Sequence, residues 1–283
     1  MSKPTRPIEV GEEGEGPKPR MKGVKHKILV MSGKGGVGKT TVTVNLACGL
    51  ARKGYKVGIM DADIHGPTVP KMLGLDGAEV LVGEGGRMIP ADGPCGLKVL
   101  SIAFLLPDKD AAVIWRGPLK ASLLKKFVLE SDWGELDYLL IDLPPGTGDE
   151  PLSVVDLIPE ADGTVIVSTP QEVALQSVRK SISFSRSLDL RVLGMIENMN
   201  GFVCPKCGEV SYIFGKGGAK EMAHELGIRL LGSLPLEARV EESGEEGSPL
   251  PPGSSPFEVV VEELLVSIAE GKDRDICRPL EDR

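Results

Sequence analysis

The sequence predicts a single α/β domain, built on a doubly wound, mostly parallel sheet with helices on both faces. Three observations lead to this fold class. Short runs rich in Val, Ile and Leu alternate with helical patterns, which is typical of parallel sheets covered on both faces. Glycine is abundant, with 36 of 283 residues, and aromatic residues make up only 4%. A glycine-rich segment joins the first apolar run to the first helical stretch, where such folds bind phosphate.

Seven apolar runs are the expected strands. Most are continuously apolar rather than alternating, as strands buried on both faces are. Because helical stretches separate them, we expect right-handed crossovers and parallel pairing. In chain order the runs are Ile28–Ser32, Val57–Asp61, Leu97–Ser101, Tyr138–Asp142, Thr164–Ser168, Val192–Glu197 and Arg229–Leu231.

The helical stretches between these runs carry recognisable start signals. The first covers Thr40–Lys53 and follows the glycine-rich segment directly. Thr169 is the expected N-cap of a helix toward Leu188, with proline and glutamate at its first and third positions. Ser255 repeats this signature before the last helix. One apolar stripe of that helix is formed by Phe257, Val260, Val261, Leu264, Leu265 and Ile268.

The two ends of the chain differ in composition from the middle. Residues 1–25 are polar and rich in Gly, Pro, Glu and Lys, so they are expected to form a disordered tail. Residues 26–271 form the expected domain, and 272–283 a C-terminal tail. Within the domain, residues 243–255 are rich in Gly, Pro, Ser and Glu, which predicts a surface loop.

Charge and hydropathy exclude some classes of partner. The formal net charge is −8, whereas nonspecific nucleic-acid binding needs a basic surface. Acidity also disfavours docking on anionic lipid. No apolar run is long enough to span a bilayer, and the N-terminus lacks the apolar core of a signal peptide. We therefore expect a cytoplasmic protein with no nucleic-acid or membrane partner.

The glycine-rich segment matches the phosphate-binding motif G-x-x-x-x-G-K-[ST] between an apolar run and a helical stretch, as a P-loop NTPase requires. Its backbone N–H groups are expected to face phosphate oxygens of ATP. Lys39 should reach the β- and γ-phosphates, and Thr40 should ligate Mg²⁺. The expected nucleotide-binding residues are Gly33, Lys34, Gly35, Gly36, Val37, Gly38, Lys39, Thr40 and Thr41.

Three acidic residues follow predicted strands and complete the expected Mg-ATP site. Asp142 ends an apolar run, and a carboxylate at the carboxyl end of a strand lies where open α/β sheets bind ligands. Asp61 and Asp63 follow another run. One of the two would hold a metal-bound water and the other would orient the attacking water, with Thr40, Asp61 and Asp142 at the Mg²⁺ site. The alternative is that these are ordinary loop caps.

One pair among the five cysteines has the spacing of a metal knuckle. Cys204 and Cys207 form C-P-x-C-G, and a short β-like run follows, which predicts a small hairpin that binds metal or a cluster. A dithiol redox pair is the alternative. Two thiolates do not complete a four-ligand site, so the missing ligands would come from another chain. No ligand spacing relates the pair to Cys48, Cys95, Cys277, His26, His65 or His224.

These motifs together resemble a known family. Gly33–Thr41, with Lys34 inside the loop, resembles the deviant Walker A of the class that includes the nitrogenase iron protein, MinD and plasmid-partition ATPases. No cysteine precedes Cys48, so the chain resembles the shorter Mrp/ApbC form of the Mrp/ApbC/Nbp35 iron–sulfur cluster carriers. That resemblance, from about residue 25 to about residue 269, rests on Asp61–Pro67, Trp115–Pro118, Asp142–Asp149, Asn198–Met199 and Cys204–Gly208.

The resemblance implies roles for particular residues. Lys34 would contact the nucleotide of a partner chain across a homodimer interface. Asp63 would activate water, and Asp142 would begin the second switch segment. Asn198 would bind the adenine edge, and Pro235 would flank the base.

It also implies cofactors and partners. The expected cofactors are ATP, Mg²⁺ and a [4Fe–4S] cluster, with zinc as a possible substitute. The cluster would be held by Cys204 and Cys207 of both chains, because a twofold axis brings two identical pairs together. Slow ATP hydrolysis would accompany delivery to apo iron–sulfur proteins.

Two other functions compete at this level. A spatial-organiser ATPase of the MinD or partition kind would need a basic face. The last helix is instead acidic, with Glu258, Glu262, Glu263 and Glu270. A nucleotide-switched module with structural zinc also fits, because zinc and iron–sulfur clusters both bind thiolates.

Overall fold

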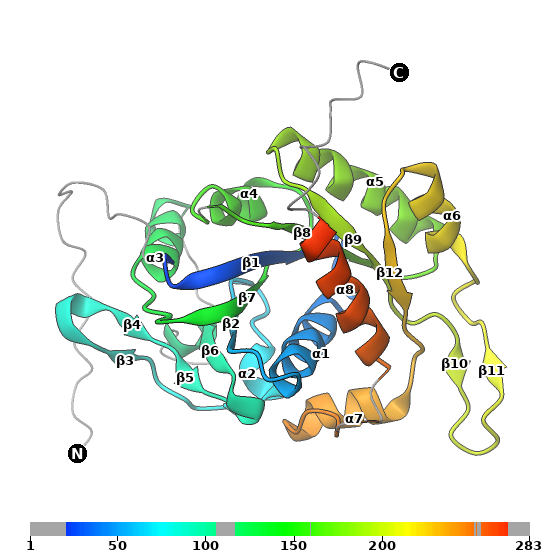
Figure 1. The fold of residues 1–283 in the computed structure, drawn as a ribbon, viewed down its shortest axis with the longest axis horizontal. Helices are drawn as coiled ribbons and strands as arrows, with labels where there is room; N and C mark the ends of the chain where they lie inside the picture. Colours follow the sequence, from blue (N-terminus) through cyan, green and yellow to red (C-terminus); the bar gives the residue numbers. More distant parts are fainter. Residues whose placement is uncertain (1–20, 106–116, 159, 252, 254–255, 271–283) are drawn as a thin grey trace.

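The computed structural model describes residues 21–105, 117–158, 160–251, 253 and 256–270 (Figure 1). Most of the two expected tails, with Cys277, Ser255 and Trp115, lies outside these residues. The centre is an eight-stranded sheet of order β12-β9-β8-β1-β7-β2-β6-β5. Its neighbours pair in parallel except β5, which pairs antiparallel with β6. The expected fold class is therefore confirmed.

All seven expected strands are present, with ends shifted by a few residues. The sheet strands are β1 Val24–Met31, β2 Val57–Asp61, β5 Ala91–Asp92, β6 Lys98–Ser101, β7 Leu136–Asp142, β8 Gly163–Ser168, β9 Val192–Glu197 and β12 Leu230–Ser233. Two small antiparallel hairpins lie outside the sheet: β3 Leu81–Val82 with β4 Met88–Ile89, and β10 Phe202–Val203 with β11 Val210–Ser211.

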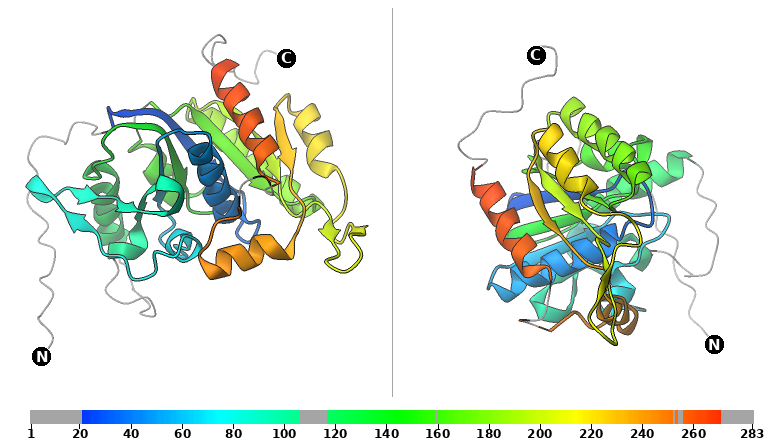
Figure 2. Two further views of the ribbon diagram at one scale, coloured as in Figure 1. Left: turned by 60° about the horizontal axis from the view of Figure 1, so that its bottom comes forward. Right: turned by 90° about the vertical axis from the view of Figure 1, so that its right-hand side faces the viewer.

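Helices cover both faces of the sheet (Figure 2). Alternate residues of β1 show the two layers. Ile28 and Val30 join the core that includes residues of α1, α2 and α8, while Leu29 and Met31 join the core with α3, α4, α5 and α6. The α-helices are α1 Lys39–Arg52, α2 Val69–Met72, α3 Gly117–Leu129, α4 Asp149–Val155, α5 Glu172–Ser187, α6 Gly218–Glu225, α7 Ala238–Glu246 and α8 Glu258–Glu270. Short 3₁₀ turns are η1 Glu84–Gly86, η2 Pro94–Gly96 and η3 Ile102–Leu105.

Three expectations from the sequence need correction. α5 begins at Glu172 with Gln171 as its N-cap, and the Thr169 hydroxyl instead donates to the Gln171 side chain at 3.4 Å. α7 extends into the expected loop at residues 243–255, because its Val240 packs against the core and Gly247, with φ 66°, ends it. β1 begins at Val24, four residues earlier than expected, so residues 24 and 25 belong to the sheet rather than to the tail.

The stripe expected on the last helix is confirmed. Phe257, Val260, Val261, Leu264 and Ile268 are buried, and Leu265 packs against them. Among the described residues, no helix combines the length and the apolarity needed to cross a membrane.

The carboxyl ends of the central strands lie at one edge of the sheet. Register places Val30 and Asp61 on either side of Asp142. The segments that leave β1, β2, β7, β8 and β9 therefore converge, and these segments carry the predicted site residues.

Candidate functional site

The P-loop, residues 33–40, connects β1 to α1 in a tight backbone path. Gly36 and Gly38 have φ of 78° and 79°, a left-handed conformation that favours glycine. A side chain at Gly38 would come within 2.2 Å of the Asn198 amide nitrogen, and one at Gly33 within 2.4 Å of Ser177 in α5. The loop is thus held close to β9 and α5, with its N–H groups at the start of a helix.

Asp142 is the centre of the charged network below the loop. Its side chain is fully buried and lies 2.7 Å from the Lys39 ammonium, which is 6% exposed. The hydroxyls of Thr40 and Thr43 donate to its two oxygens, each at 2.7 Å. The predicted Walker residues Lys39, Thr40 and Asp142 are therefore brought together by α1 and the end of β7.

Asp61 and Asp63 border this network from the end of β2. The buried Asp61 carboxyl accepts hydrogen bonds from the Ser101 hydroxyl at 2.9 Å and the Val69 N–H at 3.3 Å. Burial, and then the charge of Asp142, raises the pKa of Asp61 to about 8, so this carboxyl is mostly uncharged at pH 7 in the absence of a cation. Asp63 lies 4.0 Å from the Lys39 ammonium and is the more accessible of the two carboxyls.

The space above these groups fits a phosphate chain. A cavity of about 240 Å³ is lined by residues that include Gly35, Gly38, Lys39, Thr40 and Asp63. The buried Lys39 ammonium, held beside Asp142, lines this cavity, where it can contact phosphate oxygens. Hydroxyl and carboxylate oxygens beside it are the donors that Mg²⁺ prefers. These residues would hold Mg-ATP.

Lys34 points to a different neighbour from Lys39. Its ammonium donates to the Gln171 side-chain oxygen at 3.3 Å, and the Ser32 hydroxyl donates to its carbonyl at 3.0 Å. Lys34 does not line the phosphate cavity. In a single chain this lysine is therefore held by the start of α5.

Asn198 and Pro235, the two residues expected at the adenine, do not line the phosphate cavity. The Asn198 amide donates to the Val37 carbonyl at 2.9 Å, so it binds the P-loop backbone. Pro235 follows β12 in a segment that pairs with the one after β9, where the Leu236 N–H donates to the Gly201 carbonyl at 2.8 Å. Their contact with a base stays a prediction.

The cysteine pair lies at the tip of the β10–β11 hairpin, which projects from one end of the molecule (Figures 1 and 2). The hairpin predicted from the sequence is confirmed by the pairing of Val203 with Val210. The turn is closed by the Gly208 N–H, which donates to the Cys204 carbonyl at 2.9 Å. Gly208 has φ 74°, as the turn of a metal knuckle requires.

Both thiols are accessible, and the pKa of one of them is lowered. Cys207 is exposed and Cys204 half-buried, and neither is in a disulfide. Backbone N–H groups of Cys207 and Lys206 that point at the sulfur lower the pKa of Cys204, which favours the thiolate that metals bind. No group of three or more His, Cys, Asp or Glu converges on one point in the part of the chain that the structure describes. The hairpin thus offers two sulfur ligands, Cys204 and Cys207.

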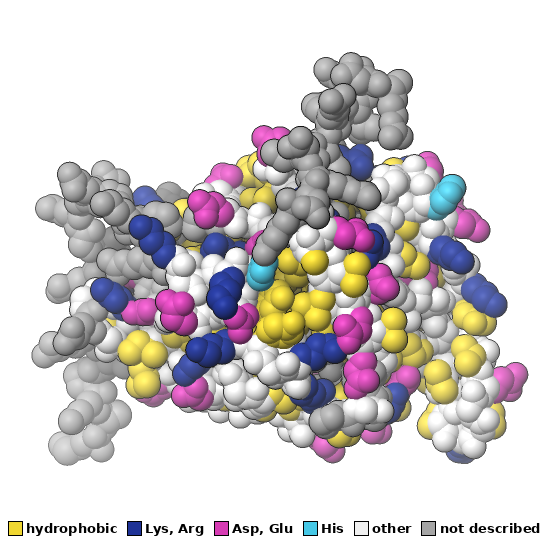
Figure 3. All heavy atoms as spheres, viewed as in Figure 1, with side chains coloured by type: hydrophobic (Ala, Val, Ile, Leu, Met, Phe, Trp, Pro, Cys, Tyr) yellow, Lys and Arg dark blue, Asp and Glu magenta, His cyan; other side chains and the backbone are white. Residues whose placement is uncertain are grey.

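Apolar side chains surround the hairpin. Figure 3 shows apolar atoms at the surface of this end of the molecule, and Val210, Tyr212 and Ile213 are between 44% and 58% exposed. The Lys216 ammonium lies 4.5 Å from the centre of the Tyr212 ring. This mixture is typical of a surface that meets another protein.

Two of the other cysteines also lie together. Cys48 is buried in α1 and Cys95 is exposed in η2. Burial, and then the neighbouring Cys95, raises the pKa of Cys48 to about 12. Neither lies at the hairpin, in agreement with their lack of ligand spacing.

Sequence reasoning missed three residues of the nucleotide site. Thr43 lies three positions after Thr40, on the same face of α1. This spacing could have predicted that both hydroxyls reach the same carboxylate. Ser101 ends β6 and Gln171 follows β8, at the ligand-binding edge of the sheet. Only the order of the strands in the sheet shows that Ser101 lies beside Asp61 and that Gln171 lies beside Lys34.

A P-loop between β1 and α1, a buried acid at the end of β7 and a parallel sheet define a P-loop NTPase. A sequence model of the ParA type, described as NUBPL iron-transfer P-loop NTPase, matches residues 23–269. The chain belongs to this family of iron-transfer P-loop NTPases.

Curated relatives support the assignment. The chain is 48% identical over 256 residues to an iron-sulfur cluster carrier protein of Methanocaldococcus jannaschii, with 89% of this chain and 88% of the relative covered. It is 47% identical over 232 residues to the cytosolic Fe-S cluster assembly factor CFD1 of Eremothecium gossypii, with 80% and 82% covered.

Solved structures agree on the fold. A nucleotide-binding protein of Archaeoglobus fulgidus in complex with ADP is 43% identical, with a TM-score of 0.71, and the match covers 81% of this chain and 88% of that one. MinD of Aquifex aeolicus is 24% identical with a TM-score of 0.61, covering 89% and 100%, and shares the fold.

Proposed function

We propose that this protein is an ATP-dependent carrier that binds a [4Fe–4S] cluster between two copies of the chain and delivers it to apoproteins. The observation that carries the proposal is the exposed two-thiol hairpin in a chain that also carries the P-loop residues of a nucleotide site. Relatives at about half identity are named as cluster carriers and assembly factors, and the family is described as iron-transfer.

The cluster site follows from ligand counting. A [4Fe–4S] cluster takes four thiolates, and one chain supplies Cys204 and Cys207. A twofold axis at the hairpin would bring two identical pairs together. The exposed apolar residues around the hairpin would be covered partly by the second copy. A cluster held at this edge stays accessible, which a cluster that is handed on must be.

The nucleotide site supports hydrolysis of ATP. Lys39 and the P-loop N–H groups would hold the β- and γ-phosphates, and Thr40, Asp61 and Asp142 would hold or support Mg²⁺ through oxygen. Bound Mg²⁺ would neutralise charge on the phosphates. Asp63, the more accessible carboxylate, would orient a water for attack on the γ-phosphorus, which gives ADP and phosphate.

The position of Lys34 suggests how the dimer contributes. Its ammonium is bound to Gln171 in one chain, outside the phosphate cavity. In the ATP-bound dimer it would leave Gln171 and contact phosphate of the partner chain. Because two chains would be needed to complete the site, turnover by the monomer should be slow.

Anaerobic reconstitution with iron and sulfide tests the function. We expect brown protein with about four iron and four sulfide per dimer. The mass of the assembly in solution should depend on the cluster or on ATP. Incubation with an apo [4Fe–4S] enzyme should restore that enzyme's activity. A colourless zinc protein that never takes up iron, or a full cluster on a monomer, would contradict the proposal.

A further inference from the structure

Two segments line the phosphate cavity from the ends of neighbouring strands. One is residues 61–68, at the end of β2 and beyond it, and the other is residues 142–150, which lead from β7 into α4. Asp63 and Thr68 line the cavity from the first segment, and Pro145 lines it from the second. A phosphate chain bound there would lie beside both segments.

The two segments are tied to each other at two points. Close to the sheet, the Ala62 N–H donates to the Asp142 carbonyl at 3.0 Å. Farther from the sheet, the Nε2 atom of the His65 ring lies 2.9 Å from a carboxylate oxygen of Glu150, in the first turn of α4. Asp63 lies between these two ties in the sequence, so the short stretch that carries it is anchored at both ends.

Asp63 divides its two oxygens between its own turn and the cavity. The Oδ1 atom accepts hydrogen bonds from the His65 N–H at 3.2 Å and the Gly66 N–H at 3.4 Å. The Oδ2 atom lies on the side of Lys39, 4.0 Å from its ammonium. The side chain of His65 is thus bound to Glu150 while its backbone holds Asp63. A movement of His65 would therefore turn the Oδ2 atom relative to bound phosphate.

The His65–Glu150 pair is poorly placed to stabilise the fold. The His65 side chain is 65% exposed and that of Glu150 36%, and an ion pair this exposed contributes little to folding. Catalysis is more sensitive to such a contact, because a displacement of about 1 Å can slow a reaction about 100-fold. A contact that restricts the turn of Asp63 can therefore matter for hydrolysis even where it matters little for stability.

We propose that His65 and Glu150 form a clamp that positions Asp63 for ATP hydrolysis. This role rests on the proposed function, in which Asp63 orients the attacking water. His65 and Glu150 are positioning residues, because neither lines the phosphate cavity and each acts through the turn that holds the Asp63 carboxylate. Loss of the clamp should lower turnover and leave ATP affinity unchanged, since the P-loop keeps its contacts with phosphate.

Turnover at saturating Mg-ATP and separately measured ATP affinity test the clamp. Glu150→Ala and His65→Ala should each lower kcat about threefold to fivefold, the range that an exposed pair supports, with Kd within about twofold of the parent. The double variant should be about as slow as either single variant, because both changes remove the same contact. Glu150→Gln keeps an oxygen for the His65 ring and should restore most of the parental kcat.

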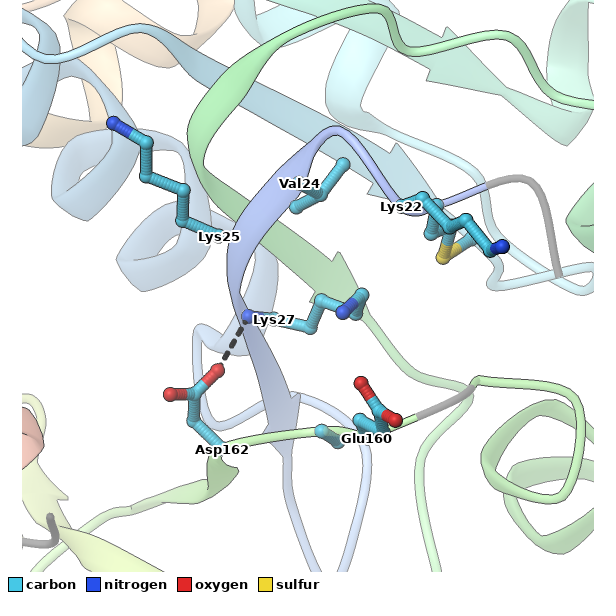
Figure 4. Close-up of a pocket in the computed structure, with 8 residues that line it drawn as sticks. Lys22, Val24, Lys25, Lys27, Glu160 and Asp162 are labelled. Carbon is cyan, nitrogen blue, oxygen red and sulfur yellow. Dashed lines mark hydrogen bonds between the residues drawn. The ribbon is translucent and has the colours of Figure 1, made fainter.

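Two substitutions elsewhere in the chain are the matched controls. Glu160→Ala removes an exposed carboxylate near the amino-terminal end of β1, the end opposite to the P-loop (Figure 4). His224→Ala removes an exposed histidine of α6. Neither residue lines the phosphate cavity, and both variants should keep the parental kcat and Kd.

Hydrogen exchange of the His65 and Gly66 amides reports on the clamp without any hydrolysis. In the nucleotide-free protein, NMR should show exchange at these amides about threefold or more faster in Glu150→Ala, and unchanged exchange in Glu160→Ala. If the parent hydrolysed no ATP but this difference were present, the clamp would stand and the proposed function would fail. The clamp is overturned if both amides exchange at the parental rate in Glu150→Ala, if the effects of the single variants multiply in the double variant, or if ATP affinity falls as much as kcat.

Discussion

The nucleotide site and the cysteine hairpin begin at the same edge of the sheet but differ in burial. Asp61 and Asp142 are fully buried, and the Asp142 oxygens are bound by Lys39, Thr40 and Thr43. The hairpin has strands of two residues and an exposed Cys207. A buried polar network fixes its geometry, whereas a small exposed hairpin opens and exchanges easily. Under the proposed function, the buried region would hold its ligand and the exposed hairpin would release the cluster.

The largest expected effect is the loss of cluster binding when one cysteine of the hairpin is removed. Cys204→Ala and Cys207→Ala should each abolish cluster binding, because a dimer would then supply two thiolates instead of four. ATPase activity should stay within about twofold, since neither cysteine touches the buried network. Iron and sulfide content with parallel turnover assays measure both effects. Cys95→Ala is the matched control and should keep the cluster. Loss of the cluster in this variant would show that a cysteine outside the hairpin contributes to the cluster site.

The next effect concerns the buried network. Lys39→Ala should weaken ATP binding about 100-fold or more, because the main cationic partner of the phosphates is removed. Nucleotide affinity by fluorescence titration is the measurement. The hairpin should still load a cluster, and a variant that loses both functions together would show that the two regions do not separate as described.

A conservative change at Asp63 should separate binding from hydrolysis. Asp63→Asn keeps an oxygen for the His65 and Gly66 N–H groups, which donate to it at 3.2 and 3.4 Å. ATP affinity should therefore stay close to that of the parent, while turnover falls about 100-fold because the water is no longer oriented by a carboxylate. Parental turnover would exclude Asp63 from this role.

Lys34 should matter for assembly more than for affinity. Lys34→Ala should bind ATP within about threefold of the parent as a monomer, because the lysine lies on Gln171 and outside the phosphate cavity. The ATP-dependent dimer should be lost in sedimentation velocity. If Lys34→Ala and Lys39→Ala lose monomer affinity equally, the lysine acts within its own chain.

The smallest expected effect is a difference in alkylation rate among the cysteines of the cluster-free protein. Alkylation with iodoacetamide at pH 7, read by peptide mapping, should be fastest at Cys204, because its lowered pKa gives more thiolate. Cys48 should react last, because burial raises its pKa to about 12. As the pH rises, the advantage that the lowered pKa gives to Cys204 should shrink. A Cys48 that labels early would show that α1 opens readily.

The features that the sequence predicted correctly depend on local signals. The P-loop, the apolar runs and the C-P-x-C-G knuckle each lie within a few consecutive residues. The Thr169 cap was wrong, because a capping signature is also local: the Thr169 hydroxyl contacts the Gln171 side chain instead of a helix N–H, and α5 begins at Glu172. Gln171 and Ser101 could not be found, because only the order of strands brings them to Lys34 and Asp61.

The hydrogen bond from Asn198 to Val37 has a mechanical consequence. The same residue that holds the P-loop backbone lies six positions before Cys204, and six residues span at most about 20 Å. A shift of the P-loop at Val37 would therefore break this bond, turn the Asn198 side chain, or displace the segment that leads into the hairpin. The P-loop and the segment that leads to the cysteine pair are therefore joined within one protomer through the Asn198 side chain, over a path shorter than the length of β1.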